Sequence, residues 1–165
     1  MKMLAPLALP LALLVSLTGC GLQPLYAGGA SGPVVQGLSA IEVPAIAGRE
    51  GWLVRNALVD RFGQTGATPR YRLDVVLDDE VEGLGLLTDD TIGRERRTLR
   101  ARYQLVDLSS GAVLLDATAG SDAGIDVVSS EFATIAAEQT ALENLSHEVA
   151  DQIVARLSRT LREAP

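Results

Sequence analysis

Two kinds of side chain in this sequence could do chemistry: a single cysteine near the start and a run of arginines in the middle. Cys20 is the one cysteine among 165 residues, so its thiol is free to take a covalent group and cannot form a disulfide within the chain. The segment 94–102 holds five arginines and one acid, Glu95. Because guanidinium groups bind phosphates and carboxylates through paired hydrogen bonds, this segment is a candidate anion-binding surface.

The first 20 residues have the layout of a secretory signal that ends at Cys20. Lys2 precedes an apolar run, 3–17, which is shorter than the ~20 residues of a membrane-spanning helix. The run ends in Leu-Thr-Gly-Cys, which resembles the lipobox of bacterial lipoproteins, where the cysteine takes a diacylglyceryl group and becomes the mature N-terminus. We therefore expect a signal peptide over 1–19 and an acylated Cys20 that attaches the chain to membrane lipid. The alternative is an ordinary signal peptide with a cysteine near its cleavage site by chance.

Composition and charge exclude several classes of function. The formal net charge is −7, which argues against bulk attraction to nucleic acid or to an anionic membrane surface. His147 is the one histidine, so a site with several histidine ligands is impossible, and we expect neither a metal nor another cofactor. The acidic pairs, such as Asp89-Asp90, converge on no nucleophile with a base, and we expect no enzyme activity.

The middle of the chain predicts an antiparallel sheet. Apolar and polar residues alternate over 71–78 and again over 99–105, the period of strands with one apolar face. A three-residue loop over 89–91 would pair Leu77 with Tyr103. A second three-residue loop, Ser109 to Gly111, has glycine where a positive φ is needed and would pair Leu105 with Leu115. We therefore expect a three-stranded meander.

Two amphipathic helices are expected around this meander. The first spans 51–62 and ends at Gly63, with Trp52 as a core anchor or, alternatively, as a contact to a partner. The second spans 131–162, with Ser130 as its N-cap and an apolar stripe that begins at Phe132 and Ile135.

The domain organisation follows from these elements. Residues 20–37 are expected to form the lipidated N-terminus and a flexible leash, and 38–165 a single α+β domain whose first strand lies within 38–47. The expected architecture is a two-layer sandwich: a four-stranded, mostly antiparallel sheet with both helices on one face, in the order β-α-β-β-β-α.

The residues after Cys20, Gly-Leu-Gln-Pro-Leu-Tyr, resemble the start of the LptE family of lipopolysaccharide-assembly lipoproteins. Leu22 departs from the Phe that is often found there, and Ala27 intervenes before the usual glycine. The resemblance continues in Arg55-Asn56, in the Tyr-Gln-Leu-Val-Asp that starts at Tyr103, and in the alanine-rich last helix.

What the resemblance implies is an α/β sandwich inside the lumen of the LptD outer-membrane β-barrel, which helps lipopolysaccharide reach the cell surface. In the lipoproteins that the signal resembles, Asp after the cysteine favours retention in the inner membrane, so Gly21 indicates the outer membrane, on its periplasmic side. The alternative is a free-standing, lipid-anchored periplasmic binding lipoprotein.

The predicted register divides the five arginines into two groups. Two have an acidic residue across the strand pair: Arg100 faces Glu80, and Arg102 faces Asp78. The other three have none and lie beside the apolar Leu84, Leu86 and Leu87: Arg94, Arg96 and Arg97. These three are the candidate contacts to lipopolysaccharide phosphates. Contact with acidic groups of the barrel and plain solvation of an edge strand remain as alternatives.

Overall fold

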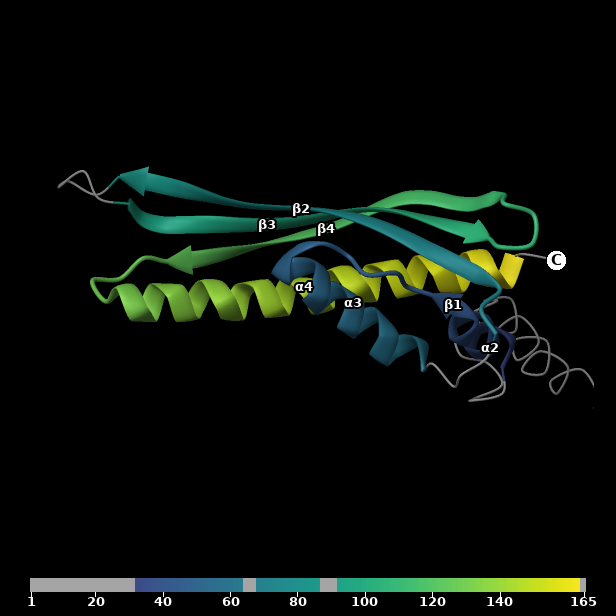
Figure 1. Cartoon of the computed structure of the whole chain (residues 1–165). Helices are drawn as coiled ribbons and strands as arrows, with labels where there is room; N and C mark the ends of the chain where they lie inside the picture. Colours follow the sequence, from purple (N-terminus) through teal and green to yellow (C-terminus); the bar gives the residue numbers. More distant parts are fainter. Residues whose placement is uncertain (1–31, 64–67, 87–91, 164–165) are drawn as a thin grey trace, which may run out of the picture.

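The computed structural model describes residues 32–63, 68–86 and 92–163 (Figure 1). The elements follow in the order α2 (Pro33–Ser39), β1 (Ile41–Glu42), α3 (Gly48–Phe62), β2 (Tyr71–Leu86), β3 (Ile92–Asp107), β4 (Val113–Asp126) and α4 (Glu131–Glu163). The expected α+β class with a four-stranded sheet is confirmed. The expected signal peptide and Cys20 lie outside the described residues.

The sheet has the order β1-β2-β3-β4, and β3 is paired along its length on both sides. The three long strands form the expected antiparallel meander, while β1 is parallel to β2 and pairs Ile41 with Tyr71. The first strand is much shorter than the expected 38–47, because the chain leaves the sheet after Glu42.

The β3–β4 register is confirmed, and the β2–β3 register is wrong by two residues. Leu105 pairs with Leu115 as expected, but Leu77 pairs with Ala101 rather than with Tyr103. The last β2–β3 pair is Leu86 with Ile92, so residues 87–91 connect the strands instead of a loop of three. A shift of two residues keeps every side chain on its expected face, since side chains alternate with a period of two.

Among the described residues, three helices lie on one face of the sheet, where two were expected (Figure 1). α2 includes residues 33–37, so the leash prediction is wrong there: Pro33 begins the helix, and Val34 and Leu38 are buried. α3 ends where expected, at Gly63 with a φ of 60°. In α4 the Ser130 hydroxyl accepts from the Ala133 N–H at 3.4 Å, the expected N-cap.

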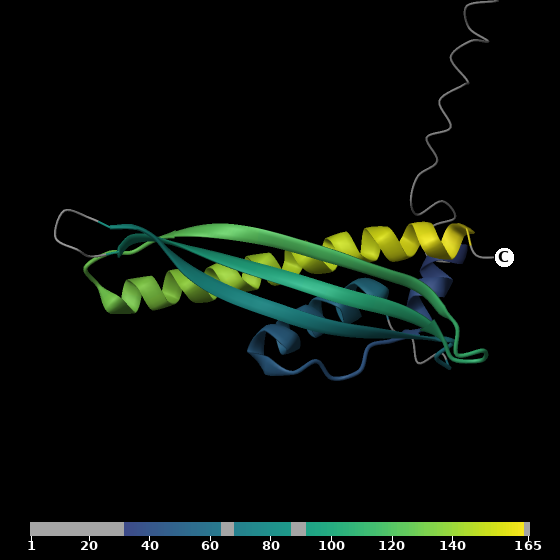
Figure 2. The same ribbon diagram turned by 90° about the horizontal axis from the view of Figure 1, so that it is seen from above.

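The core lies between the sheet and these helices. α4 has 33 residues, or about 50 Å, and β3 has 16, or about 53 Å, so one helix matches the length of the sheet (Figure 2). Odd-numbered residues of β3 meet the middle of α4, and all of the following are buried: Leu99, Ala101, Tyr103, Leu105, Leu142, Leu145, Val149, Ile153 and Leu157. The buried part of the apolar stripe of α4 stops short of the start of the helix, because Phe132 is 82% and Ile135 is 43% exposed.

The turn between β3 and β4 is held by one carboxylate. Asp107 Oδ1 accepts from the backbone N–H of Ser109 at 2.8 Å and of Ser110 at 3.0 Å, and also from the Ser109 hydroxyl. Gly111 completes the turn with a φ of 72°, as its position in the loop predicts. The hydrogen bonds, above all from the Ser109 side chain and then from the two backbone N–H groups, lower the pKa of Asp107 from 3.8 to about 2.

Asp107→Asn should lower the stability of the fold at neutral pH, because an amide oxygen replaces a carboxylate that accepts several hydrogen bonds. Because the pKa of Asp107 is lower in the folded than in the unfolded chain, the ionised carboxylate stabilises the folded state above pH 4. This contribution disappears as the pH falls from about 4 to about 2. Urea unfolding of the wild type and of Asp107→Asn should be measured between pH 7 and pH 2. Their free energies of unfolding should differ at pH 7 and converge near pH 2. A difference that is independent of pH would contradict this role.

Candidate functional site

The outer face of the sheet, which the helices leave uncovered, carries a row of arginines along β3. Arg94, Arg96, Arg100 and Arg102 are all even-numbered and exposed, while the odd-numbered Leu99 between them is buried. Acidic residues flank the row on both sides, from β2 and from β4. The alternation of β3 thus places four guanidinium groups on one solvent-facing surface.

Arg94 and Arg96, at the distal end of the row, have carboxylate partners, so the premise that they lack one is wrong. Arg94 Nε lies 3.3 Å from Asp126 Oδ1, and Arg96 Nε lies 4.0 Å from Asp122 Oδ2. Both partners come from β4, whereas the prediction took account only of acidic residues on β2. The signal was present in the sequence, because the correctly predicted β3–β4 register, continued toward the distal end, places Asp126 opposite Arg94.

Arg97 is the odd-numbered arginine, and its side chain belongs to the helical side of the sheet. It is 14% exposed and forms a bidentate pair with Asp79, whose side chain is 15% exposed; Nε lies 2.8 Å from Oδ1. Its Nη1 also donates to the Glu138 carbonyl of α4 at 3.2 Å. The hydrogen bond to Asp79 raises the pKa of Arg97. This arginine therefore links β2, β3 and α4, and it too has a carboxylate partner, contrary to the prediction.

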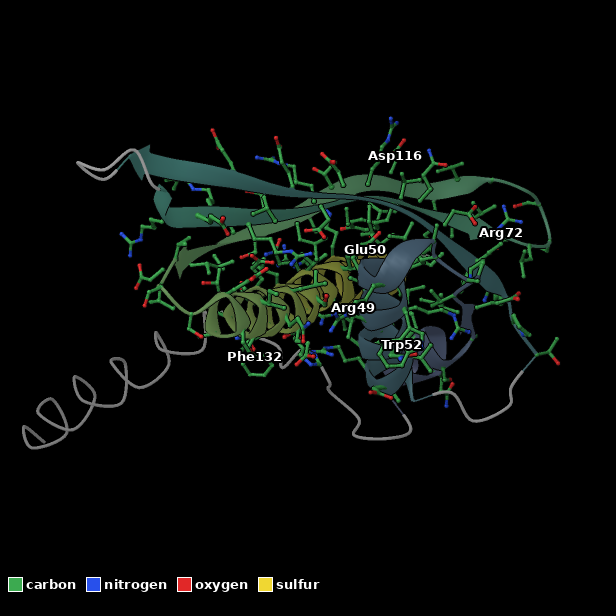
Figure 3. All side chains as sticks on the ribbon, turned by 60° about the vertical axis from the view of Figure 1, so that its left-hand side comes forward. Arg49, Glu50, Trp52, Arg72, Asp116 and Phe132 are labelled. Atoms are coloured by element: carbon green, nitrogen blue, oxygen red, sulfur yellow. The ribbon has the colours of Figure 1, made fainter. Side chains whose placement is uncertain are left out.

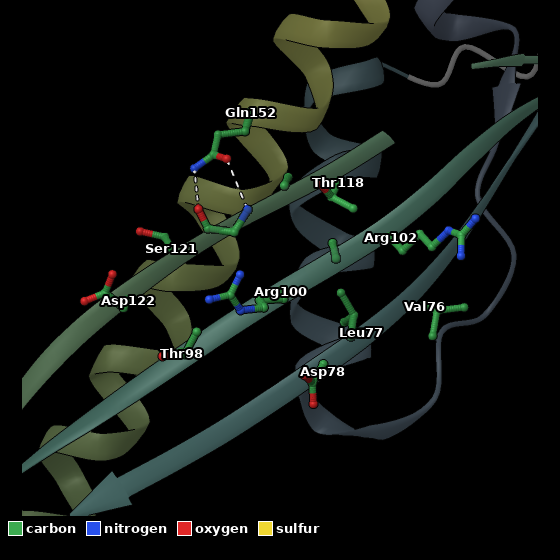
Figure 4. Close-up of a pocket in the computed structure, with 13 residues that line it drawn as sticks. Val76, Leu77, Asp78, Thr98, Arg100, Arg102, Thr118, Ser121, Asp122 and Gln152 are labelled. Carbon is green, nitrogen blue, oxygen red and sulfur yellow. Dashed lines mark hydrogen bonds between the residues drawn. The ribbon is translucent and has the colours of Figure 1, made fainter. Parts of the chain in front are cut away.

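The two arginines that were expected to pair with β2 do not do so. Arg102 lies 3.0 Å from Asp116 on β4, and Arg100 faces Asp78 across the strands without a carboxylate within 4 Å among the described residues. On its other side Arg100 faces Gly120, where an added Cβ would lie 3.4 Å from the Arg100 Cγ. An open groove of about 480 Å³ surrounds Arg100, with the Thr98 and Thr118 side chains at its walls (Figure 4).

The expected apolar patch beside the arginines is described only in part. Leu84 is half-buried in β2, while the Leu86 side chain and Leu87 lie outside what the structure describes.

Two large aromatic side chains are exposed on the helical layer. Trp52 is 62% exposed, so the core-anchor prediction is wrong, and Phe132 is 82% exposed (Figure 3). In Figure 3 Phe132 projects below α4, away from the sheet, and Trp52 lies on α3, whereas Asp116, on the same face as the arginine row, projects from the opposite side of the sheet. Sequence periodicity placed both on amphipathic helices, but it cannot tell which apolar residues of a helix remain uncovered.

The described residues assemble no metal centre. No group of three or more His, Cys, Asp or Glu side chains within 32–63, 68–86 and 92–163 could hold an ion. His147 is exposed on α4, and its backbone carbonyl accepts a 3.4 Å hydrogen bond from Arg61. In the same parts of the chain, no helix is both long and apolar enough to cross a membrane.

Comparison with known proteins gives a family match. The model of the family described as LptE, lipopolysaccharide-assembly, matches residues 38–157, from the end of α2 to near the end of α4. A search of curated proteins gives no match.

Solved structures share the fold. A candidate lipoprotein from Caulobacter crescentus CB15 has 27% identity and a TM-score of 0.68, covering 81% of this chain and 99% of its own. Rare lipoprotein B from Shewanella oneidensis has 11% identity and a TM-score of 0.54, covering 74% and 95%. A minor lipoprotein from Acinetobacter baumannii has 16% identity and a TM-score of 0.53, covering 72% and 88%. The last two similarities concern the fold alone.

Arg97→Ala should destabilise the fold by about 2 kcal/mol, because it leaves the largely buried Asp79 carboxylate without its partner. Arg97→Lys should recover part of this loss, since an ammonium group keeps the charge but cannot form the bidentate pair. The matched control is Arg102→Ala, whose side chain is 69% exposed and should matter less. Urea unfolding midpoints, compared at an unchanged slope of the transition, measure the stability of all three variants. Equal losses of stability for Arg97→Ala and Arg102→Ala would contradict the role of Arg97 as a link between β2, β3 and α4.

Proposed function

We propose that this chain, which belongs to the LptE family of lipopolysaccharide-assembly proteins, is an outer-membrane lipoprotein that plugs an LptD-type β-barrel. In this role it is anchored through acylated Cys20 on the periplasmic side, supports assembly of the barrel and assists insertion of lipopolysaccharide at the cell surface. The family match over 38–157 is the observation that carries the proposal. The lipobox that ends at Cys20 supports the anchor.

The polarity of the sheet supports the role of a plug. Large outer-membrane barrels have polar interiors, so a domain that fills one needs a polar outer surface. The uncovered face of this sheet has charged side chains on all three long strands, among them Asp78, Arg100 and Asp116. No observation on the described residues favours the alternative of a free-standing binding lipoprotein.

The distal end of the arginine row is the proposed contact to lipopolysaccharide. The Arg94 and Arg96 side chains are 65% and 50% exposed, and each has one exposed carboxylate within 4.0 Å among the described residues. Glu82 of β2 also stands opposite Arg96, at a longer distance. Exposed ion pairs are weak, so a phosphate with more than one charge can compete for these guanidinium groups. Arg97 has a supporting place in this proposal, because its pair with Asp79 fixes the strand that carries the other two.

The plug role predicts a stable one-to-one complex with a large outer-membrane barrel. Full-length protein with a C-terminal tag, purified from gently solubilised membranes, should bring one barrel protein with it. Mass spectrometry of the purified chain should find Cys20 acylated at the N-terminus.

Cys20→Ala separates the anchor from the plug. The variant should lose its lipid, but any copies already seated in the barrel should still purify with it. Wild-type protein that is isolated as a free monomer, with no barrel partner after crosslinking, would overturn the plug role. An unmodified Cys20 would overturn only the anchor.

The double variant Arg94→Gln, Arg96→Gln should bind lipopolysaccharide roughly tenfold more weakly at low salt, because two charged contacts to phosphate are lost. The difference from wild type should shrink as salt rises, since salt screens exposed charges. Thermal stability should stay nearly unchanged. The matched control is Arg102→Gln, on the same strand and face but away from the distal end. The assignment fails if the double variant binds as wild type does, or if Arg102→Gln weakens binding equally.

A further inference from the structure

The outer edge of β4 has backbone hydrogen-bonding groups that no strand uses. β4 is the last strand of the sheet, and only its inner edge pairs, with β3. The Val127 N–H donates to the Gly93 carbonyl, so odd-numbered residues of β4 direct their backbone groups toward β3. Even-numbered residues from Asp116 to Asp126 therefore direct theirs outward. Such an edge is a template for pairing with another strand.

One side chain closes this edge at its midpoint. The Gly120 N–H donates to Gln152 Oε1 at 3.2 Å, and Gln152 Nε2 donates to the Gly120 carbonyl at 3.1 Å (Figure 4). A primary amide has the donor and the acceptor of a peptide group, so Gln152 takes the place that a residue of an added strand would occupy. In the described part of the chain, no hydrogen bond reaches the outward backbone groups of Thr118 or Asp122 on either side.

A groove beside the edge has room for an added strand. It has a volume of about 550 Å³ and lies between Ala117 and Ala119 of β4 and Ala155 of α4. Gln152 and two arginines of α4, Arg156 and Arg159, also line it. Figure 2 shows the second half of α4 emerging past β4, so the helix forms a floor beyond the strand. A strand that pairs with β4 would therefore find partners for its backbone and for the side chains that face the helical layer.

The sequence of β4 is complementary to itself around Gly120. In an antiparallel pair of two β4 strands centred there, Gly120 faces its counterpart and Thr118 faces Asp122 of the other copy. This register opposes even-numbered residues, which are the ones with outward backbone groups, so the hydrogen bonds can form.

The remaining pairs of this register are compatible on both faces. Toward the helices, Ala117 meets Ala123, Leu115 meets Ile125 and Ala119 meets Ser121, so no charged groups oppose each other on this face. On the outer face Asp116 meets Gly124, and no like charges stand directly opposite. Each acid of β4 on this face also lies within 4.0 Å of an arginine of its own β3, which lowers repulsion between the two copies.

We propose that the β4 edge is a self-pairing site for a second copy of this chain, and that Gln152 is the gate that closes it. Pairing requires the Gln152 side chain to leave Gly120, after which the Gly120 of the partner takes its two hydrogen bonds. The gate keeps the free chain from joining its sheet to that of another copy. This site concerns the chain outside any barrel and does not depend on the proposed function.

Disulfide trapping tests the register. The full-length chain with Cys20→Ser, purified in detergent, receives Thr118→Cys and Asp122→Cys together or singly. The double variant should form a disulfide-linked dimer under mild oxidation, because these positions face each other. Each single variant should not, since like positions lie about 13 Å apart in the proposed pair.

Removal of the gate should strengthen the pairing. Gln152→Ala should lower the dimer Kd about tenfold in sedimentation experiments and raise the trapped fraction, since the edge no longer has to give up two hydrogen bonds. Gln139→Ala, an exposed glutamine of the same helix, is the matched control and should change neither.

Gln152→Glu provides a second variant. Its carboxylate can accept from the Gly120 N–H but cannot donate to the carbonyl, so its Kd should lie between those of wild type and Gln152→Ala. The proposal is overturned if folded Gln152→Ala and Gln152→Glu are as monomeric as wild type. It is also overturned if the single cysteine variants are trapped as readily as the double.

Discussion

The strict alternation of side chains on β3 is the constraint on which the rest of this structure depends. β3 is paired on both sides, so it cannot rotate or slip without breaking two ladders at once. Its odd-numbered residues, such as Leu99 and Tyr103, form the floor of the core, and its even-numbered arginines face solvent. A slip of one residue would bury guanidinium groups against α4, which carries a large desolvation cost. The buried odd-numbered residues and the exposed even-numbered arginines of β3 therefore both require the same register.

How much of the sheet the sequence predicts depends on the chemistry of each turn. Between β3 and β4, Asp107 and Gly111 hold a short turn that is longer than the predicted three-residue loop. A bulge between Leu105 and Val106 takes up the difference, so the predicted register holds from Leu105 onward. Between β2 and β3 the same kind of argument chose a loop of three residues where 87–91 connect the strands. The faces remained correct because the error was an even number of residues. The individual ion pairs were predicted incorrectly, because a shift of two residues assigned Arg100 and Arg102 to the wrong partners.

The helical layer was less predictable, because periodicity reports that a helix has an apolar face but not which of its apolar residues contact the sheet. α4 has an apolar stripe along its whole length, and only the part beyond the first turns is covered. Trp52 faces solvent for the same reason, since none of the described residues covers that side of α3. α2 had a usable signal that the predicted leash overlooked: a proline at its start, with Val34 and Leu38 one turn apart.

Polar links between α4 and the sheet explain why a two-layer domain can leave one face free. Arg97 donates to the Glu138 carbonyl near the start of the helix, and Gln152 binds the β4 edge near its middle. Both interactions use the helical side or the edge of the sheet, so neither consumes a side chain of the outer face. Hydrophobic contacts alone have little directionality and would allow α4 to slide along the sheet. The Ser121 hydroxyl of β4 also donates to the Glu148 carboxylate of α4. Because these polar links set the position of α4, the charged outer surface is available for contacts with other molecules.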